Sequence, residues 1–254
     1  MIRNYKKADL IIGNNVLAHN PNLNNFIKGL KIALKPKGII TLEFPHLLKL
    51  ITNCQFDTIY HEHFSYFSLY SIKNILLKNN LEIYSVKEIP THGGSLRIYL
   101  KHKEDQTRKV SLNIAQILDK EKKAGLKNLK TYNDFKLKVN SLKRDLLLFL
   151  IKAKNHHKNI VGYGAAAKGN TLLNYCGIST DIVDYVVDTN PHKQNKYLPG
   201  SHIPVKNPHF IKKDKPDYVL ILPWNIKAEL IKKLLYIKNW GGKFIIPSPR
   251  VKVI

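Results

Sequence analysis

Residues 159–174 (NIVGYGAAAKGNTLLN) join a short apolar run, a glycine turn and the start of an amphipathic segment. This order predicts a buried strand over residues 159–164 that leads directly into a helix over residues 165–174. Glycine suits the turn because it adopts backbone angles that other residues avoid. A strand that enters a helix through a glycine turn is typical of α/β proteins with a parallel sheet.

The same alternation of strands and helices continues on both sides of this segment. Residues 81–89 and 95–101 flank the pair Gly93-Gly94, which predicts a hairpin. The other predicted strands are residues 8–14, 38–44, 182–188, 218–222 and 243–246, and the other predicted helices are residues 22–34, 68–80 and 227–239. In the last third of the chain this alternation predicts a parallel, doubly wound sheet, and both ends of the chain look Rossmann-like.

The middle of the chain has a different character. Residues 110–157 are rich in Lys and Leu and lack proline, and their apolar residues recur with a helical period. We expect two helices, broken near residues 129–133, that join two domains. The predicted apolar stripe consists of Leu142, Leu146, Leu147, Leu148 and Ile151. The expected division is residues 1–108, a linking part over 109–158, and residues 159–254.

Composition excludes several classes of protein. The 254 residues are 44% hydrophobic and contain no apolar run of the roughly 20 residues that a membrane-spanning helix needs. Residues 1–9 lack the pattern of a signal peptide. Cys54 and Cys176 are far apart, which excludes a disulfide scaffold and a self-contained cysteine-ligated zinc site. We therefore expect a cytoplasmic, globular protein with no membrane partner.

The charge is strongly positive, since 42 Lys+Arg residues against 18 Asp+Glu residues leave a formal net charge of +24. Such a charge suits polyanions, including nucleic acid and phosphorylated substrates. The excess is mostly Lys and is scattered, and the densest stretch, residues 120–138, has the spacing of a solvated helix face. We expect a solvated surface with some attraction for a diphosphate ligand, and no nucleic-acid partner.

The sequence Tyr60-His61-Glu62-His63 concentrates titratable side chains in one segment. A loop can bring Tyr60, Glu62 and His63 to one site, where they suit general acid–base chemistry. His19 follows the carboxyl end of the first predicted strand, where α/β sheets bind ligands. Each His alone is more simply interpreted as a satisfied surface or core residue. Because HxH lacks a further obvious ligand, we expect no metal.

The glycine turn carries a second candidate site. Gly162, Gly164 and Lys168 lie where backbone N–H groups and a Lys can bind a phosphate, and Ala167 replaces the last glycine of a GxGxxG pattern. Asp188 ends the next predicted strand, at the position of a ribose-binding acid. These residues suggest a nicotinamide oxidoreductase. Tight packing of the strand against the helix explains the glycines equally well.

Six motifs together resemble a known family. The motifs are NNVLAH (14–19), YHEHF (60–64), THGGSL (91–96), GYGAAAKGNTLLN (162–174), DTNPHKQN (188–195) and PGSHIPV (199–205). In this order they closely resemble the S-adenosylmethionine (SAM)-dependent NDP-hexose C-methyltransferases, in particular the sugar 3-C-methyltransferases. The resemblance extends across essentially the whole chain.

The resemblance implies an α/β fold: the C-terminal part of a class I methyltransferase (Rossmann-like) sheet, then helices, then a second Rossmann-like parallel-sheet domain. It also implies removal of a proton beside a 4-keto group of a nucleotide-linked deoxysugar, and attack of the enolate on the methyl carbon of SAM. His63 matches the general base, with Tyr60, Glu62 and His19 lining the same site. Gly162, Gly164 and Lys168 are the residues expected to bind the substrate.

The resemblance begins at what would be the fourth strand of the methyltransferase sheet. The zinc-binding cysteines and the glycine loop that holds SAM have no counterpart here, so we expect a partner: an N-terminal fragment encoded separately. A non-catalytic nucleotide-sugar-binding module, or a degenerate remnant of the enzyme, is the second hypothesis. The nicotinamide oxidoreductase is the third.

Overall fold

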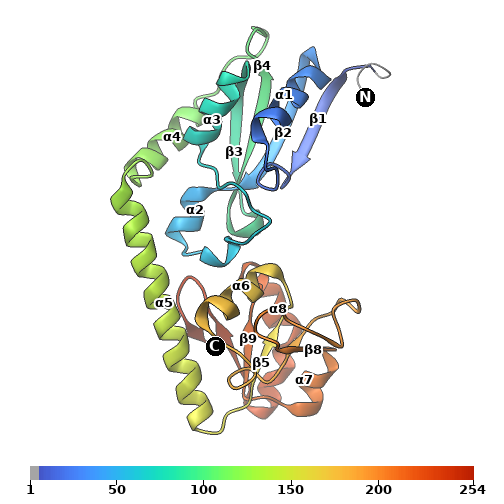
Figure 1. Ribbon diagram of the computed structural model, residues 1–254, viewed down its shortest axis with the longest axis vertical. Helices are drawn as coiled ribbons and strands as arrows, with labels where there is room; N and C mark the ends of the chain where they lie inside the picture. The colour runs from blue at the N-terminus through green and yellow to red at the C-terminus, as the bar shows by residue number, and fades with distance from the viewer. Residues whose placement is uncertain (1–5) are drawn as a thin grey trace. The chain divides into compact units, whose positions relative to one another are not determined.

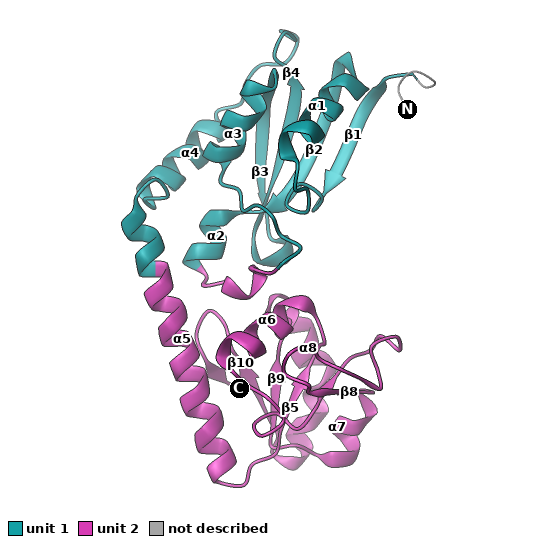
Figure 2. Cartoon of the chain, viewed as in Figure 1, with its two compact units in different colours: residues 1–52, 61–134 teal, residues 53–60, 135–254 magenta. Residues whose placement is uncertain are grey.

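The structure is a computed structural model that describes residues 6–254 and divides into two compact units (Figure 2). Unit 1 contains the described residues up to Thr52 together with His61–Asp134. Unit 2 contains Asn53–Tyr60 and Phe135–Ile254. The chain therefore enters unit 2 briefly, returns to unit 1, and enters unit 2 again. The domain boundaries expected at residues 108 and 158 stay predictions.

Unit 1 is built on a sheet of four strands (Figure 1). The strands are β1 (Ala8–Asn14), β2 (Leu34–Pro45), β3 (Leu81–Ile89) and β4 (Ser95–His102), in the order β1-β2-β4-β3. β1 and β2 are parallel, whereas β4 is antiparallel to both β2 and β3. The predicted hairpin is confirmed, because the short turn η2 (Thr91–Gly93) between β3 and β4 leaves no room for a parallel crossover.

Four helices of unit 1 are α1 (Leu23–Ala33), α2 (Leu47–Thr52), α3 (Leu69–Lys78) and α4 (Asn113–Lys123). Asn22 caps α1 by accepting a hydrogen bond from the Asn25 N–H, and Ser68 and Ser71 cap α3 reciprocally. Apolar residues of α1, α3 and α4 pack with those of the sheet in one core. β1 ends the sheet and leaves Leu10 53% and Ile12 64% exposed.

The long helix α5 (Leu129–Asn155) corrects two expectations. The break between the helices lies at residues 124–128, because Gly125 has a positive φ of 72° there. The buried stripe of α5 is Val139, Leu142, Leu146, Leu150 and Ala153. Leu148 and Ile151 were predicted to be part of the stripe, but they are 72% and 47% exposed, since they lie on the opposite side of the helical period.

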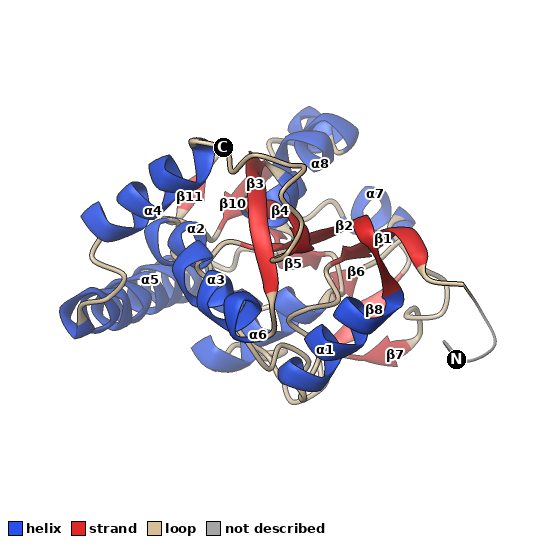
Figure 3. Cartoon of the chain, turned by 90° about the horizontal axis from the view of Figure 1, so that it is seen from above, coloured by secondary structure: helices blue, strands red, loops and turns tan. Residues whose placement is uncertain are grey.

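Unit 2 contains a second sheet of seven short strands, with loops between most elements (Figure 3). Its strands are β5 (Ile160–Tyr163), β6 (Val186–Val187), β7 (Lys196–Tyr197), β8 (Pro204–Lys206), β9 (Tyr218–Ile221), β10 (Lys243–Ile246) and β11 (Lys252–Val253). The five inner strands, in the order β10-β9-β5-β6-β8, are parallel, and only the edge strands β7 and β11 are antiparallel. The predicted α/β class with a Rossmann-like parallel sheet is thereby confirmed.

The helices of unit 2 contribute to two separate hydrophobic cores. Its helices are α6 (Ala167–Cys176), α7 (His209–Asp214) and α8 (Lys227–Lys233), with the short turns η1 (Phe56–Thr58), η3 (Trp224–Ile226) and η4 (Leu235–Trp240). The helix expected over residues 227–239 is therefore α8 followed by η4. One core contains residues of α5 and α6, and a second contains residues of α7 and α8. No helix among residues 6–254 is long and apolar enough to cross a membrane.

Candidate functional site

The structure brings two of the predicted catalytic residues of unit 1 together. His19 lies in the loop that follows β1, and the ring centroids of His19 and His63 are 4.8 Å apart in an edge-to-face arrangement. The Phe64 N–H donates to the Ala18 carbonyl at 2.8 Å, which joins the two loops at this point. Leu17 and Ala18 are buried, so the loop that carries His19 is anchored in the core.

The other predicted catalytic residues are placed differently. Glu62 is exposed in the same loop as His63. Tyr60 is half-buried and ends the segment that belongs to unit 2. Tyr66 was not predicted, yet its ring centroid lies 6.0 Å from that of His63. The position of Tyr66 in the aromatic stretch that follows the YHEHF motif could have indicated it as a candidate site residue.

The paired imidazoles suit proton transfer. Imidazole accepts and returns a proton at neutral pH, and a neighbouring aromatic edge holds its ring orientation. Across residues 6–254 there is no group of three His, Cys, Asp or Glu side chains that could hold a metal ion.

A hydrogen-bonded network lies at the carboxyl ends of β1 and β2. The Asn15 Nδ2 and His92 Nε2 atoms are 3.2 Å apart, and both residues have positive φ angles. Glu43, only 4% exposed, accepts hydrogen bonds from Thr91 Oγ1 at 2.9 Å and from Arg97 Nη2 at 2.8 Å. Sequence reasoning missed these roles, although two of the six motifs contain Asn15, Thr91 and His92. Strained backbone beside a buried, hydrogen-bonded carboxylate is typical of a functional edge.

In unit 2 the glycine turn after β5 is tightly packed. A Cβ atom on Gly162 would lie 2.7 Å from a Val186 methyl group. Gly164 has a φ of 95°, and a Cβ atom there would lie 2.7 Å from the Pro223 ring. The Ala165 N–H donates to Asp188 Oδ2 at 2.7 Å, so this carboxylate binds the turn itself.

Lys168 lies at a topological switch point. The chain continues from β5 to β6 on one side, and β9 pairs with β5 on the other, so the loops after β5 and β9 face each other. Lys168 Nζ donates to Asn225 Oδ1 at 2.9 Å across these loops and lies 5.0 Å from the centroid of the Trp224 ring. Burial lowers the pKa of the Lys168 ammonium group.

Asp57 also lies here, and nothing in the sequence indicated it. Its side chain is buried, and its Oδ2 atom accepts a hydrogen bond from Trp224 Nε1. Burial raises the pKa of Asp57 to about 6, although the Trp224 hydrogen bond and the Lys168 charge oppose this rise.

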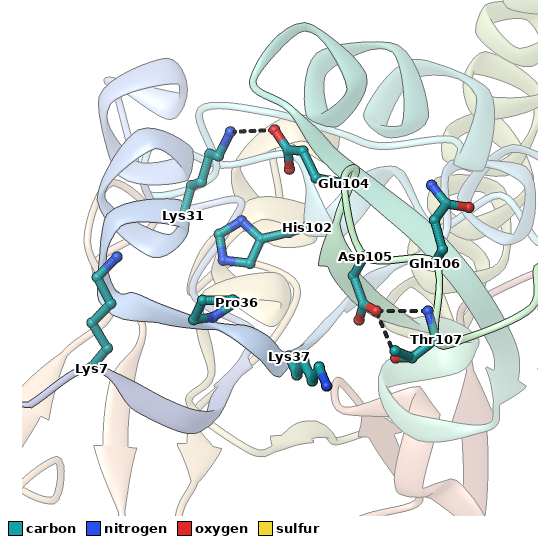
Figure 4. A pocket seen from close by; sticks show the side chains of 9 residues that line it. All are labelled: Lys7, Lys31, Pro36, Lys37, His102, Glu104, Asp105, Gln106 and Thr107. Atoms are coloured by element: carbon teal, nitrogen blue, oxygen red, sulfur yellow. Dashed lines mark hydrogen bonds and ion pairs between the residues drawn. The ribbon is translucent and has the colours of Figure 1, made fainter.

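Two cavities of unit 1 lie away from the predicted site residues. One, of about 410 Å³, is lined by residues at the amino ends of β1 and β2 and just past β4, with Lys31 Nζ 3.4 Å from Glu104 Oε1 (Figure 4). The other, of about 320 Å³, lies between the start of α3 and α4 and is lined in part by Ser68 and Glu121. None of the predicted site residues lines either cavity.

Comparison with known proteins identifies relatives for both parts of the chain. The family model described as the C-methyltransferase C-terminal domain matches residues 90–249, and the model of a methyltransferase domain matches residues 3–86. C-methyltransferase NovU of Streptomyces niveus is 34% identical over 247 residues. This alignment covers 97% of the present chain and 59% of NovU, so the chain spans about three fifths of that relative.

Proposed function

Because the chain belongs to the C-methyltransferase family, we propose that it acts in the transfer of a methyl group from SAM to a carbon of a nucleotide-linked keto-deoxysugar. The observation that supports this proposal most strongly is the contact between His19 and His63, which unites two motifs far apart in the sequence. The family membership also favours a methyltransferase over a nicotinamide oxidoreductase.

His63 is the proposed general base. Its imidazole nitrogen takes the proton from the carbon beside the keto group, and the electron pair of the C–H bond passes toward the keto oxygen to form an enolate. His19 and Tyr66 hold the His63 ring in place. Tyr60 and Glu62, from the same sequence motif, are the further polar groups proposed for the reaction. SAM, when bound, supplies an electrophilic methyl group to the enolate carbon and keeps the bonding pair on its sulfur.

Asn15 is a residue that fits SAM. Its Oδ1 atom is buried and has no hydrogen-bond partner among residues 6–254, at the carboxyl edge where α/β sheets bind ligands. This oxygen would accept a hydrogen bond from a hydroxyl or amino group of SAM.

We further propose that the diphosphate of the substrate binds at the start of α6, after Gly162 and Gly164. The helix begins at Ala167 with no side chain capping its N–H groups, which favours an anion. Lys168 and Lys193 supply positive charge beside this turn, since Lys193 Nζ donates to the Ala165 carbonyl at 2.7 Å.

The open edge of β1 supports a proposal about a partner. Parallel strands are normally covered on both faces, yet Leu10 and Ile12 are largely exposed on this edge strand. NovU extends well beyond the part that matches this chain. We propose that a segment equivalent to the unmatched part, in the same polypeptide or encoded separately, pairs with β1 and supplies most of the SAM-binding site.

The proposed base is tested by wash-in of solvent deuterium into a nucleoside-diphosphate 4-keto-deoxysugar, followed by mass spectrometry. His63→Ala should lower the rate of exchange beside the keto group about 10²–10⁴-fold and leave substrate binding nearly unchanged. His61→Ala is the matched control, because His61 is exposed in the same motif. Unchanged wash-in in His63→Ala, or a larger loss in His61→Ala, would remove His63 from the role of base.

A further inference from the structure

The segment that leads into YHEHF is seated firmly in unit 2. Phe56 lies in the core, and its ring centroid is 5.0 Å from that of Tyr175 on α6. The Ser248 hydroxyl donates to the Cys54 carbonyl at 3.3 Å. The turn is also closed internally, because the Ile59 N–H donates to the Phe56 carbonyl at 2.9 Å. Residues 53–60 therefore occupy a defined place against α6.

Asp57 lies at the centre of this segment, and its buried carboxyl group lowers the stability of the folded state. It is 1% exposed, and its Oδ1 atom has no hydrogen-bond partner among residues 6–254. Its Oδ2 atom accepts the Trp224 indole N–H, and Lys168 lies over the ring of the same tryptophan. A buried carboxyl group with one unsatisfied oxygen destabilises a protein, so an apolar residue of similar size would serve packing better. The arrangement favours a role other than stability.

We propose that Asp57 is a positioning residue: through its hydrogen bond to Trp224 it fixes residues 57–60 at the switch point of unit 2 and thereby holds Tyr60. This inference rests on the proposed function, because Tyr60 is one of the proposed active-site residues. Tyr60 directly follows the turn that the Ile59 N–H closes onto the Phe56 carbonyl, so a hydrogen bond at Asp57 within this turn limits how far Tyr60 can move.

The charged and titratable groups that act on Asp57 agree with this role. Lys168 of α6 lowers its pKa, burial raises it more strongly, and Cys54 of the same segment has a pKa raised to about 11 by burial, so this thiol stays uncharged. Asp57 is therefore the one group of residues 53–57 that changes charge near neutral pH. The Trp224 hydrogen bond is strongest to the carboxylate form.

Hydrogen–deuterium exchange of the amides of residues 57–63 tests the anchor directly. Asp57→Ala and Trp224→Phe each remove one partner of the hydrogen bond, and each should raise exchange at least 10-fold. Asp57→Asn keeps an acceptor oxygen and should stay within about 3-fold of the wild type. Two variants are the matched controls: Asp181→Ala removes an exposed carboxylate, and Trp240→Phe removes the other indole of unit 2. Neither should change the amide exchange of residues 57–63. Wild-type exchange in both Asp57→Ala and Trp224→Phe would overturn the proposal; if Asp57→Ala does not fold, Trp224→Phe alone decides.

Wash-in of deuterium separates positioning from mere stability. Asp57→Ala and Trp224→Phe should lower kcat about 10-fold with KM within 2-fold, and Asp57→Asn should restore most of the rate. Raised amide exchange with wild-type kcat would show that the anchor does not position the active site, and would overturn the proposal. Retained wash-in in His63→Ala refutes the proposed base instead, and the amide exchange still decides whether Asp57 holds Tyr60.

Discussion

Replacement of Glu121 by alanine should destabilise unit 1 strongly. Glu121 lies on α4 and is 2% exposed. Its carboxylate accepts hydrogen bonds from the N–H groups of Leu69 and Tyr70, which open α3, and from His46 Nε2 at 2.8 Å. His46 is itself 1% exposed, and its Nδ1 atom has no partner among residues 6–254. One side chain therefore accepts hydrogen bonds from three donors outside its own helix, two of which are buried.

The magnitude follows from these contacts. Removal of one partner of a buried, hydrogen-bonded pair costs about 3–5 kcal/mol, because the remaining group stays buried and unsatisfied. The loss of two hydrogen bonds at the start of a helix accounts for about 1–2 kcal/mol of that amount. We expect Glu121→Ala to lower the free energy of unfolding of unit 1 by about 3–5 kcal/mol, and its Tm by about 10–20 °C.

Urea unfolding followed by two probes measures this loss. Both tryptophans, Trp224 and Trp240, lie in unit 2, so their fluorescence reports on that unit, whereas far-UV circular dichroism reports on both units. Glu88→Gln is the matched control, because Glu88 makes ion pairs with Lys49 and Lys120 at the surface, and such pairs contribute about 0–1 kcal/mol. A free energy of unfolding for Glu121→Ala within 1 kcal/mol of the wild type would refute the reasoning.

Three further predictions concern unit 2. Gly164→Ala should destabilise by about 2–3 kcal/mol in urea unfolding, because of its positive φ and a clash with a proline ring, whereas Gly177→Ala, with open space around it, should cost only about 1 kcal/mol. Leu150→Ala should cost about 2–5 kcal/mol and Leu148→Ala less than about 0.5 kcal/mol in the same assay, since the first is buried and the second is 72% exposed. Burial raises the pKa of Asp57 from 3.8 to about 6, so the folded state keeps a proton that the unfolded state has lost, and stability falls as the pH rises from about 4 to about 7. Asp57→Asn should remove up to about 3 kcal/mol of this pH-dependent decrease in the free energy of unfolding. Urea unfolding with the same pH dependence in the wild type and in Asp57→Asn would refute this prediction.

Local patterns predicted the elements well, whereas contacts between distant segments could not be predicted. The strand–turn–helix of residues 159–174 and the hairpin of β3 and β4 rest on turn residues and periodicity, which act over a few residues. The predicted stripe of α5 is right at Leu142 and Leu146 and wrong at Leu148 and Ile151, because a run of consecutive leucines does not reveal which face of the helix is buried. The burial of Leu150 is set by the residues against which α5 packs.

The same limit applies to the candidate site. His19 and His63 could be predicted as candidate catalytic residues from their side-chain chemistry and from the motifs that contain them. Neither feature indicates that the two rings are in contact. Asp57 had no signal at all, because its burial depends on a tryptophan that lies 167 positions later in the chain. A carboxylate in a polar loop is ordinarily solvated, so only the fold shows that this one is not.

The glycine turn shows how one pattern can serve two purposes. In a dinucleotide-binding protein the glycines admit a pyrophosphate, and an acid at the end of the next strand binds the ribose. Here Gly162 and Gly164 are required by contacts with Val186 and Pro223, and Asp188 accepts a hydrogen bond from the turn. The switch point between β5 and β9, where such a ligand would lie, is bridged by the hydrogen bond between Lys168 and Asn225, with Asp57 bound to the neighbouring tryptophan. A nicotinamide dinucleotide placed across this switch point would have to displace these side chains. The packing therefore accounts for both glycines without a dinucleotide, in agreement with the membership of the family.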